Sequence, residues 1–387
     1  MGKEIVRLSQ QDAPEALDFL NLVFSMAKYP HDFRKMLPKM WEDDGKHVDN
    51  HLAVKVDGRI RAIVGVYPLP ANIAGEKLLF ATMGNVATHP FDTGKGYMSE
   101  LLDAAMKQLS DMNADGARLG GTRQRYARYG YEPCGTQYRF ALTENNVSRY
   151  YSGKFRSDIV FSALDIADVD MLNWAKQLYE KNPVWIDRIS VRGFYDSVTA
   201  WESKPYVAMQ NGNPIGYLTI TKDDAGINEV NADSADHIIE IVCAWLRYKK
   251  MDSVSFTAEP WQCELLRKLQ PLCENWSINM PSRFYIRRWD RVVYAFMKLR
   301  QQVAPIADGR KLIGIQNYGT IAIEVVGGKV SVERTEETPD IVLGANEAAR
   351  FFFGPALPYS ACSFATPDSV LTSWLPLPLG WNTLDRV

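Results

Sequence analysis

The chain has 387 residues, more than one ordinary core holds, so two or three domains are expected, and we take three. A net charge of -2, with 46% hydrophobic and 23% charged residues, excludes extensive disorder and a global field that would gather nucleic acid or anionic membranes. Five cysteines without a CxxC pair suggest neither disulfides nor zinc, and no secretory leader or long apolar run occurs, so we expect a cytoplasmic protein without a membrane partner.

The first predicted elements are helical. Apolar residues over 12–41 recur at helical spacing, with an interruption at Pro30. Two strand-like runs follow, over 51–56 and 60–67, and the Asp57-Gly58 dipeptide between them favours a tight hairpin. An antiparallel pair is therefore predicted.

A strand, a glycine turn, a helix and a second strand come next. The strand over 78–87 leads into Thr93-Gly94-Lys95-Gly96, and apolar spacing over 98–109 predicts one buried helical face. A short strand over 117–120 completes the unit. This order is typical of a βαβ unit with a parallel strand pair.

A weaker echo of this order begins near residue 206. Strand-like runs flank Asn211-Gly212, and a strand over 227–230, a helix over 238–246 and a strand over 253–257 follow. The stretch over 231–236 stands where the first unit has its glycine turn, and its acidic residues would repel a phosphate. We expect no cofactor there.

The last hundred residues have a different order of predicted helices and strands. They predict a helix over 292–299, strands over 312–315, 320–325 and 330–333, and a helical stretch that ends near Phe353. The tail alternates proline with apolar residues from Leu375 onward, and a disordered tail would rarely be so apolar. We expect it to pack against the rest of the protein.

Two segments could carry chemistry. Glycines just before a helix free its first N–H groups for an anion, although the spacing matches neither the dinucleotide nor the P-loop motif, and a simple tight turn is the alternative. Residues 122–133 hold three arginines and three tyrosines after the end of a parallel strand, where ligands of open sheets bind. A solvated basic turn is the alternative for that segment.

Three motifs together resemble the GCN5-related N-acetyltransferase (GNAT) superfamily: Val86-Ala87-Thr88-His89-Pro90, then Gly94-Lys95-Gly96-Tyr97-Met98, then the run from Arg125 to Tyr131. The layout of the whole chain is similar to the enhanced intracellular survival (Eis) type. The resemblance implies a mixed α+β and α/β fold with tandem GNAT domains and a third domain like sterol carrier protein 2. The implied boundaries are 1–145 for an active domain, 146–289 for a degenerate one and 290–387 for the third.

The same resemblance implies how an acetyl-CoA cosubstrate binds. Val86 and Ala87 would present main-chain groups to the pantetheine and thioester. The pyrophosphate would lie on the turn made by Thr93, Gly94, Lys95, Gly96, Tyr97 and Met98. Thr93 replaces the usual Arg or Gln of this pattern, and Met98 replaces a small residue, which is expected to lower cofactor affinity.

Two catalytic groups are implied. Tyr126 would be the general acid that protonates the departing thiolate. The amine must lose a proton, and the resemblance points to the terminal carboxylate of Val387, inserted into the first domain. His89 is a weaker candidate base, since a His-Pro pair entering a turn is more simply structural. Asp385 either adds charge to the same pocket or is solvated.

The implied activity is acetyl transfer from acetyl-CoA to a primary amine by direct attack in a ternary complex. Small-molecule and peptide amines are the expected acceptors, and a homo-oligomer is expected because related proteins form hexamers. Two alternatives stay open: a carrier of lipids or apolar ligands that uses the third domain, and a non-catalytic acetyl-CoA sensor. Acetyl-CoA binding without turnover would favour the sensor.

Overall fold

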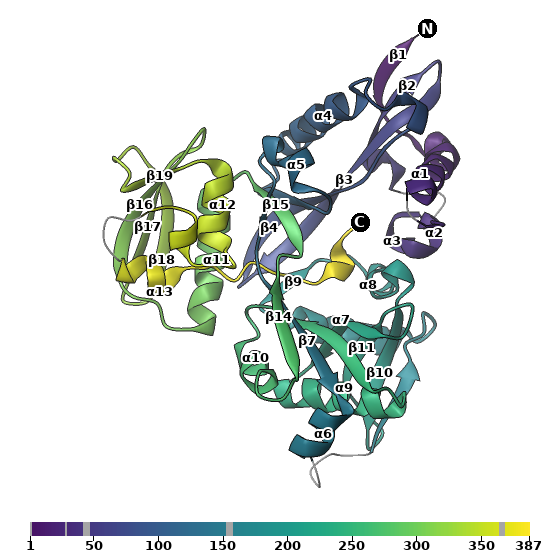
Figure 1. The fold of residues 1–387 in the computed structure, drawn as a ribbon, viewed down its shortest axis with the longest axis vertical. Coiled ribbons are helices and arrows are strands. Elements are labelled where there is room, and N and C mark those ends of the chain that lie inside the picture. Colours follow the sequence, from purple (N-terminus) through teal and green to yellow (C-terminus); the bar gives the residue numbers. More distant parts are fainter. Residues whose placement is uncertain (1, 28, 42–46, 152–157, 364–367) are drawn as a thin grey trace.

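The computed structural model describes residues 2–387 except 28, 42–46, 152–157 and 364–367. The described chain forms three lobes, each built on one β-sheet, and the two termini lie far apart along it (Figure 1). The C-terminus lies between the first two lobes rather than beside the third lobe, from which the tail comes (Figure 1). The tail therefore crosses the molecule.

The first sheet is the largest and mixes parallel and antiparallel pairs. Its order is β1 (Lys3–Arg7), β2 (His51–Val56), β3 (Arg59–Ile73), β4 (Glu76–Thr88), β5 (Gly116–Leu119), β15 (Ser282–Ile286) and β6 (Glu132–Cys134), with β9 (Val184–Ile186) beside β3. Its helices are α1 (Ala13–Ala27), α2 (Phe33–Met36), α3 (Pro38–Trp41), α4 (Tyr97–Asp111) and α5 (Arg123–Tyr126).

The helices cover both faces of this sheet because side chains alternate along each strand. Ala53 of β2 packs in the cluster under α1, whereas the next residue, Val54, packs in the cluster under α4. The predicted hairpin and the predicted parallel pair are confirmed: β2 pairs antiparallel with β3, and β4 pairs parallel with β5 across α4. One strand is longer than predicted, since β3 continues through Pro68 and Pro70.

The second sheet repeats this plan. Its order is β14 (Asn275–Asn279), β7 (Gln137–Thr143), β13 (Ser253–Ala258), β12 (Gly226–Ala232), β11 (Asn213–Ile220), β10 (Lys204–Gln210) and β8 (Ile159–Ala163). Its helices are α6 (Glu144–Tyr151), α7 (Val169–Glu180), α8 (Val191–Val198), α9 (Ala235–Tyr248) and α10 (Cys263–Leu269). The predicted echo is confirmed, because β12 and β13 are parallel and joined by α9.

The first two sheets exchange a strand. β7 directly follows β6 of the first sheet in sequence but pairs with β13 in the second sheet, while β15, far along the chain, inserts between β5 and β6 of the first. The chain therefore crosses from the first sheet to the second between β6 and β7, and it returns between β14 and β15. The division at residues 145 and 289 stays a prediction, and the pairs of β7 with β13 and of β15 with β5 cross the boundary at 145.

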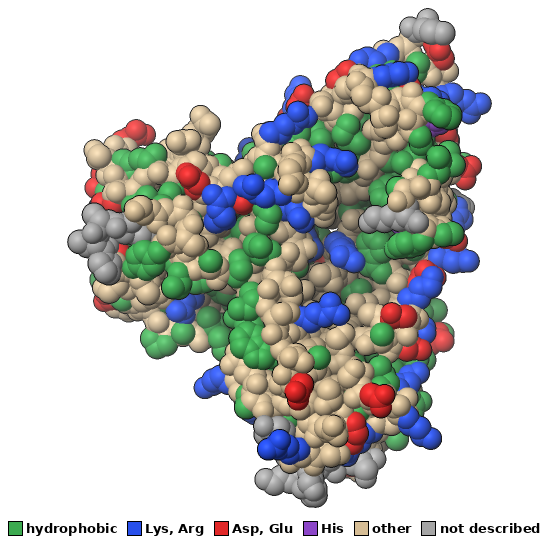
Figure 2. All heavy atoms as spheres, in the orientation of Figure 1, with side chains coloured by type: hydrophobic (Ala, Val, Ile, Leu, Met, Phe, Trp, Pro, Cys, Tyr) green, Lys and Arg blue, Asp and Glu red, His purple; other side chains and the backbone are tan. Residues whose placement is uncertain are grey.

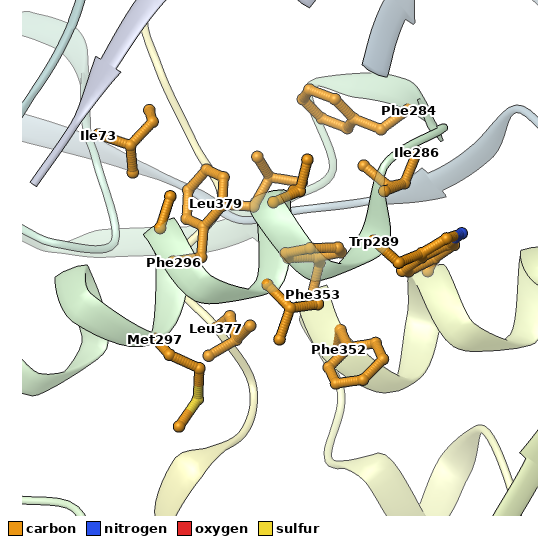
Figure 3. Packing of buried hydrophobic residues seen from close by; sticks show 14 of the residues in the cluster. Ile73, Phe284, Ile286, Trp289, Phe296, Met297, Phe352, Phe353, Leu377 and Leu379 are labelled. Carbon is orange, nitrogen blue, oxygen red and sulfur yellow. The ribbon is translucent and has the colours of Figure 1, made fainter. Parts of the chain in front are cut away.

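The third lobe shares its core with the first. Its sheet is β18 (Lys329–Thr335), β17 (Gly319–Val326), β16 (Gly309–Ile315) and β19 (Ile341–Leu343), with helices α11 (Trp289–Val303), α12 (Ala345–Phe353) and α13 (Ser369–Trp374). Figure 3 shows Phe296 and Phe353 of these helices beside Ile73 and Phe284 of the first sheet, with Leu379 of the tail among them. The predicted packing of the apolar tail is confirmed.

On the side shown in Figure 2, basic and acidic side chains intermix, so neither charge covers that face alone. None of the helices in the described part of the chain is long and apolar enough to cross a membrane. Within those residues, no cluster of histidine, cysteine and acidic side chains has the form of a metal site.

Candidate active site

The first sheet opens into a fork between β4 and β5. The two strands pair from Phe80 with Gly116 to Met83 with Leu119, and no pair follows in the described chain. From Gly84 onward β4 pairs only with β3, so one edge of its backbone faces the opening. We call this opening the first fork. It lies at the carboxyl ends of two parallel strands, where ligands of such sheets bind.

A β-bulge shapes the exposed edge of β4. Gly65 of β3 lies opposite Gly84 and Ile63 opposite Ala87, so Asn85 and Val86 together oppose a single residue. Asn85 has a φ of 53°, and such bulges re-aim side chains next to active sites. The side chain of Val86 packs toward the α4 face and that of Ala87 toward the α1 face, which leaves their main chain at the fork.

Asn85 reaches two buried polar residues that sequence reasoning did not select. Its amide nitrogen lies 2.7 Å from the Tyr67 hydroxyl, which lies 2.6 Å from Nε2 of His51. Burial lowers the pKa of His51 to about 4, so its ring is neutral at physiological pH. This neutral network fixes the bulge.

The glycine turn after β4 leaves the start of α4 open. Gly94 and Gly96 both have a φ of 83°, and a Cβ built on either meets no described atom within 4 Å. No described side chain caps α4, so the N–H groups of its first turn, which includes Tyr97 and Met98, have no side-chain acceptor. Such a helix end is a ready anion site. The hydroxyl of the exposed Thr93 donates to Pro90 O at 3.1 Å.

Ion pairs hold this turn in place. Asp92 is buried and accepts from Lys95 at 2.7 Å and from Arg61 on β3. The hydrogen bond from Lys95 holds the pKa of Asp92 below its ordinary value. Arg128 bonds Ser99 in the first turn of α4 at 2.8 Å, which brings a second cation to the helix end. The sequence indicates a basic segment here but assigns no role to Arg128.

Tyr126 lies beyond the end of β5, on α5. Its side chain is buried in the cluster that contains Met83 and Leu119, the last paired residues before the fork. A Cβ on Gly121 would come within 2.7 Å of the Tyr126 ring, so only glycine fits there. Burial raises the pKa of Tyr126, and the hydrogen bond with Arg125 opposes that rise. The phenol is therefore protonated at neutral pH.

Val387 lies at the other side of the fork. A Cβ on Gly84 would come within 2.6 Å of Val387 Cγ2 and 2.9 Å of its main-chain oxygen, so Val387 contacts the first residue of β4 that no longer pairs with β5. Val387 also packs against the cluster that contains Ala87 under α1. Tyr126 and Val387 thus approach the β4 edge from opposite faces of the sheet.

The tail is tied down just before its last residue. Asp385 is buried and accepts from Arg188 Nε at 3.0 Å, so the expectation of a solvated carboxylate is wrong. Lys39 donates to the carbonyl of Leu384 at 2.6 Å. Burial lowers the pKa of Lys39 to about 7, although the nearby Asp385 opposes the change.

His89 has a local structural role in this arrangement. Its Nδ1 accepts from the backbone of Phe91 at 3.3 Å, and its ring stacks near Phe19 with 6.3 Å between centroids. This geometry matches the structural alternative that the His-Pro pair suggested.

A cavity of about 620 Å³ opens beside Val387, between the first and second lobes. Helices α3 and α8 contribute to its wall, and Thr82 of β4 and Tyr67 of β3 form its floor. Its acidic lining residues are Asp49, Asp187, Asp196 and Asp385. Lys39, Arg188 and Arg192 line the same cavity, and Arg188 and Arg192 pair with Asp385 and Asp196, so the charge of the lining is mixed.

The comparisons with known proteins agree with this geometry. Residues 4–134 match the family model described as "Acetyltransferase (GNAT) domain". These residues form a GNAT acetyltransferase domain. The first fork and the open start of α4 both lie within the GNAT domain. The match indicates an N-acetyltransferase that uses an acyl-CoA donor.

Solved structures extend the likeness to the whole chain. A GCN5-related N-acetyltransferase from Anabaena variabilis ATCC 29413 has a TM-score of 0.71 at 13% identity and covers 98% of both chains. The corresponding protein from Kribbella flavida has 0.69 at 14%, over 100% of this chain and 98% of that one. Eis1 from Mycobacterium abscessus has 0.66 at 15%, over 98% of both.

These likenesses establish a mixed α/β fold in which the GNAT domain is followed by a second GNAT-like sheet. No curated protein matches the chain in sequence. The resemblance of the third lobe to sterol carrier protein 2 stays a prediction.

Proposed function

We propose that the protein transfers the acetyl group of acetyl-CoA to a primary amine by direct attack in a ternary complex. The observation that carries the proposal is the contact of Val387 with Gly84, because it brings a carboxylate to the fork that Tyr126 lines from the other face.

The donor would lie along the open edge of β4. Its pyrophosphate would accept hydrogen bonds from the N–H groups between Thr93 and Met98, with Arg128 beside them. The pantetheine would pair with the main chain at Val86 and Ala87, which takes the place of the missing strand partner. The thioester would then reach the fork.

The acceptor would enter from the cavity of about 620 Å³. As a primary ammonium ion it has a pKa of about 10.4, so it must lose a proton before attack. The Val387 carboxylate would orient the cation and take the proton. The neutral amine then attacks the carbonyl carbon, the C–S bond breaks, and the phenol of Tyr126 protonates the departing thiolate of CoA. The second proton of the amine leaves as the amide forms, and a proton from solvent restores the phenol.

Acetyl-CoA titration and turnover on a panel of primary amines test this proposal together. We expect binding with a stoichiometry of one per chain and amine-dependent release of the free thiol. Binding without turnover on any amine would make the protein a sensor and refute the proposal. Two equivalents per chain would refute the assignment of one active domain.

We also propose that the protein forms a homo-oligomer. The edge strand β14 supports this, because Trp276, Ile278 and neighbouring Met280 expose apolar surface on it. Sedimentation at several protein concentrations tests it, and a monomer throughout would contradict it.

A further inference from the structure

The second sheet contains a fork of the same kind. β12 and β13 pair at Gly226 with Ser255 and at Ile227 with Phe256, and the described chain shows no further pair between them. Beyond these residues β12 continues to Ala232 alongside β11 alone. We call this opening the second fork. Its position relative to α9 repeats that of the first fork relative to α4.

The second fork is closed to a phosphate. The Ser234 hydroxyl caps α9 by accepting from His237 N at 3.1 Å, whereas α4 has no such cap. Asp233 and Asp236 flank this end and pair with lysines. Because the helix end already has an acceptor and carries negative charge, an acyl-CoA would not bind there.

The chain's own tail lies in the second fork. Asn382 Nδ2 donates to the carbonyl of Asn228, the first unpaired residue of β12, at 2.8 Å. Trp261 Nε1, just after β13, donates to Gly380 O at 3.3 Å. Trp381 lines the small cavity that remains there, about 40 Å³, together with Thr257 of β13.

The space around the Cα of Gly380 is too small for any side chain. An added Cβ would lie 2.6 Å from Thr136 O and 2.8 Å from Glu259 Oε2. Both atoms belong to buried residues, so they have little room to move. The fit fixes the tail where it enters the fork.

A buried ionic clamp fixes the tail where it leaves. Arg188 pairs with Glu229 of β12, with 2.6 Å between Nη2 and Oε2, and with Asp385 at 3.0 Å through Nε. Tyr217 donates to the same Glu229 at 2.5 Å. A buried ion pair is stable only where hydrogen bonds satisfy its remaining polar atoms, as they do for Glu229. The clamp holds the tail two residues before its carboxylate.

We propose that the second fork is a dock for the chain's own C-terminal tail and that Arg188 is the positioning residue of the Val387 carboxylate. The five residues after Asn382 span at most about 17 Å, so a tail held in one fork delivers its end to the other. The second domain then has a task in catalysis without binding a cofactor. The positioning role rests on the function proposed for Val387.

Hydrogen–deuterium exchange of residues 380–387 in the full chain tests docking directly. Gly380→Ala should expose the tail to exchange while the three charges of the clamp stay in place. Arg188→Met should do the same, and Arg188→Lys should restore part of the protection because it keeps the charge. Arg247→Met, which removes a surface ion pair with Glu144 in the same lobe, is the matched control and should leave the tail protected.

Kinetics of the same variants test positioning. A carboxylate displaced by about 1 Å should lower kcat about 10- to 100-fold, with acetyl-CoA affinity unchanged. Arg188→Lys should regain part of that loss, and Arg247→Met should not lose activity. A purely structural loss would instead lower melting temperature and acetyl-CoA affinity together.

The outcomes separate the two proposals. A tail that stays protected in both Gly380→Ala and Arg188→Met shows that the second fork is not the dock. A tail that exchanges freely while kcat is normal supports the dock but overturns the positioning role, and it counts against the function proposed for Val387. Loss of protection with loss of kcat supports both.

Discussion

Tyr126 and Tyr131 share one buried cluster, and the chemistry proposed for Tyr126 separates them. Tyr126→Phe removes the proton and keeps the ring, so folding and acetyl-CoA affinity should be preserved while kcat falls about 10²-fold or more. Tyr131→Phe is the matched control, since the Tyr131 hydroxyl is buried without a hydrogen-bond partner in the described chain. A normal kcat for Tyr126→Phe, or an equal loss in both, would return Tyr126 to a structural role.

Glu259 makes stability depend on pH. Burial raises the pKa of Glu259 to about 7, from an ordinary value near 4.3. Between these values the folded chain binds the proton more tightly than the unfolded chain, so the free energy of unfolding falls as pH rises. The stabilisation is complete below about pH 4.3 and lost as pH passes about 7.

Glu259→Gln should therefore flatten the dependence of stability on pH. It keeps the shape of the side chain and its contact with Gln137, and at pH 8 it should stabilise the fold by about 1 to 3 kcal/mol. Chemical denaturation between pH 5 and 8 measures this. The control is Glu264→Gln, at an exposed partner of Lys268. Parallel pH curves for wild type and Glu259→Gln would contradict the expectation.

At the scale of elements, the start of α4 is the part of the site made from backbone alone. Gly96→Asp places a carboxylate on the proposed pyrophosphate path and should weaken acetyl-CoA binding at least about 10-fold through bulk and like charge. Gly212→Asp is a matched control, because Gly212 has a φ of 78° and equal free space at the β10–β11 hairpin. Titration calorimetry compares them. Equal affinities would remove the turn from the site.

Elements with local signals were predictable from the sequence, and elements set by distant contacts were not. The β4–α4–β5 order follows from strand runs, a glycine turn and helical spacing that lie next to one another. The sequence does not predict the extension of β3, because Pro68 and Pro70 interrupt the strand signal, although the side chains of Leu69 and Ile73 both enter the shared core. The strand exchange has no periodic signature at all.

The site divides in the same way. The placement of the glycine turn and of Tyr126 followed from motifs within fifty residues of chain. Arg188 could not be found, because its partner Asp385 lies 197 residues away and a buried arginine looks like an exposed one in sequence. Asn85 and His51 gave no signal either, since only the bulge and the sheet bring their side chains together.

At the scale of the molecule, the three lobes converge on one loop and one tail. Glu132, the first residue of β6, accepts hydrogen bonds from Arg123 of α5, the helix that carries Tyr126, and from Arg350 of α12 at 2.6 Å. Asn346 of the same helix donates to Ala127 O at 3.1 Å. The third lobe therefore braces the Tyr126 side of the fork, while the second lobe holds the tail on the Val387 side.

We propose that the carboxylate of Val387 acts in the GNAT domain, and a change of the terminal group alone tests this. Protein ligation can supply two full-length chains that differ only in the C-terminal group, one with a carboxylate and one with a primary amide. The amide keeps every side chain and the length of the tail, and it removes one charge. The measurement is kcat for each chain with the same amine acceptor, alongside acetyl-CoA affinity and tail exchange.

We predict equal acetyl-CoA affinity, equal protection of the tail and a kcat at least about 10²-fold lower for the amide, because the acceptor ammonium then lacks its base. An effect on KM alone would show that the carboxylate only attracts the cation. An amide enzyme with the kcat and KM of the carboxylate enzyme would contradict the account.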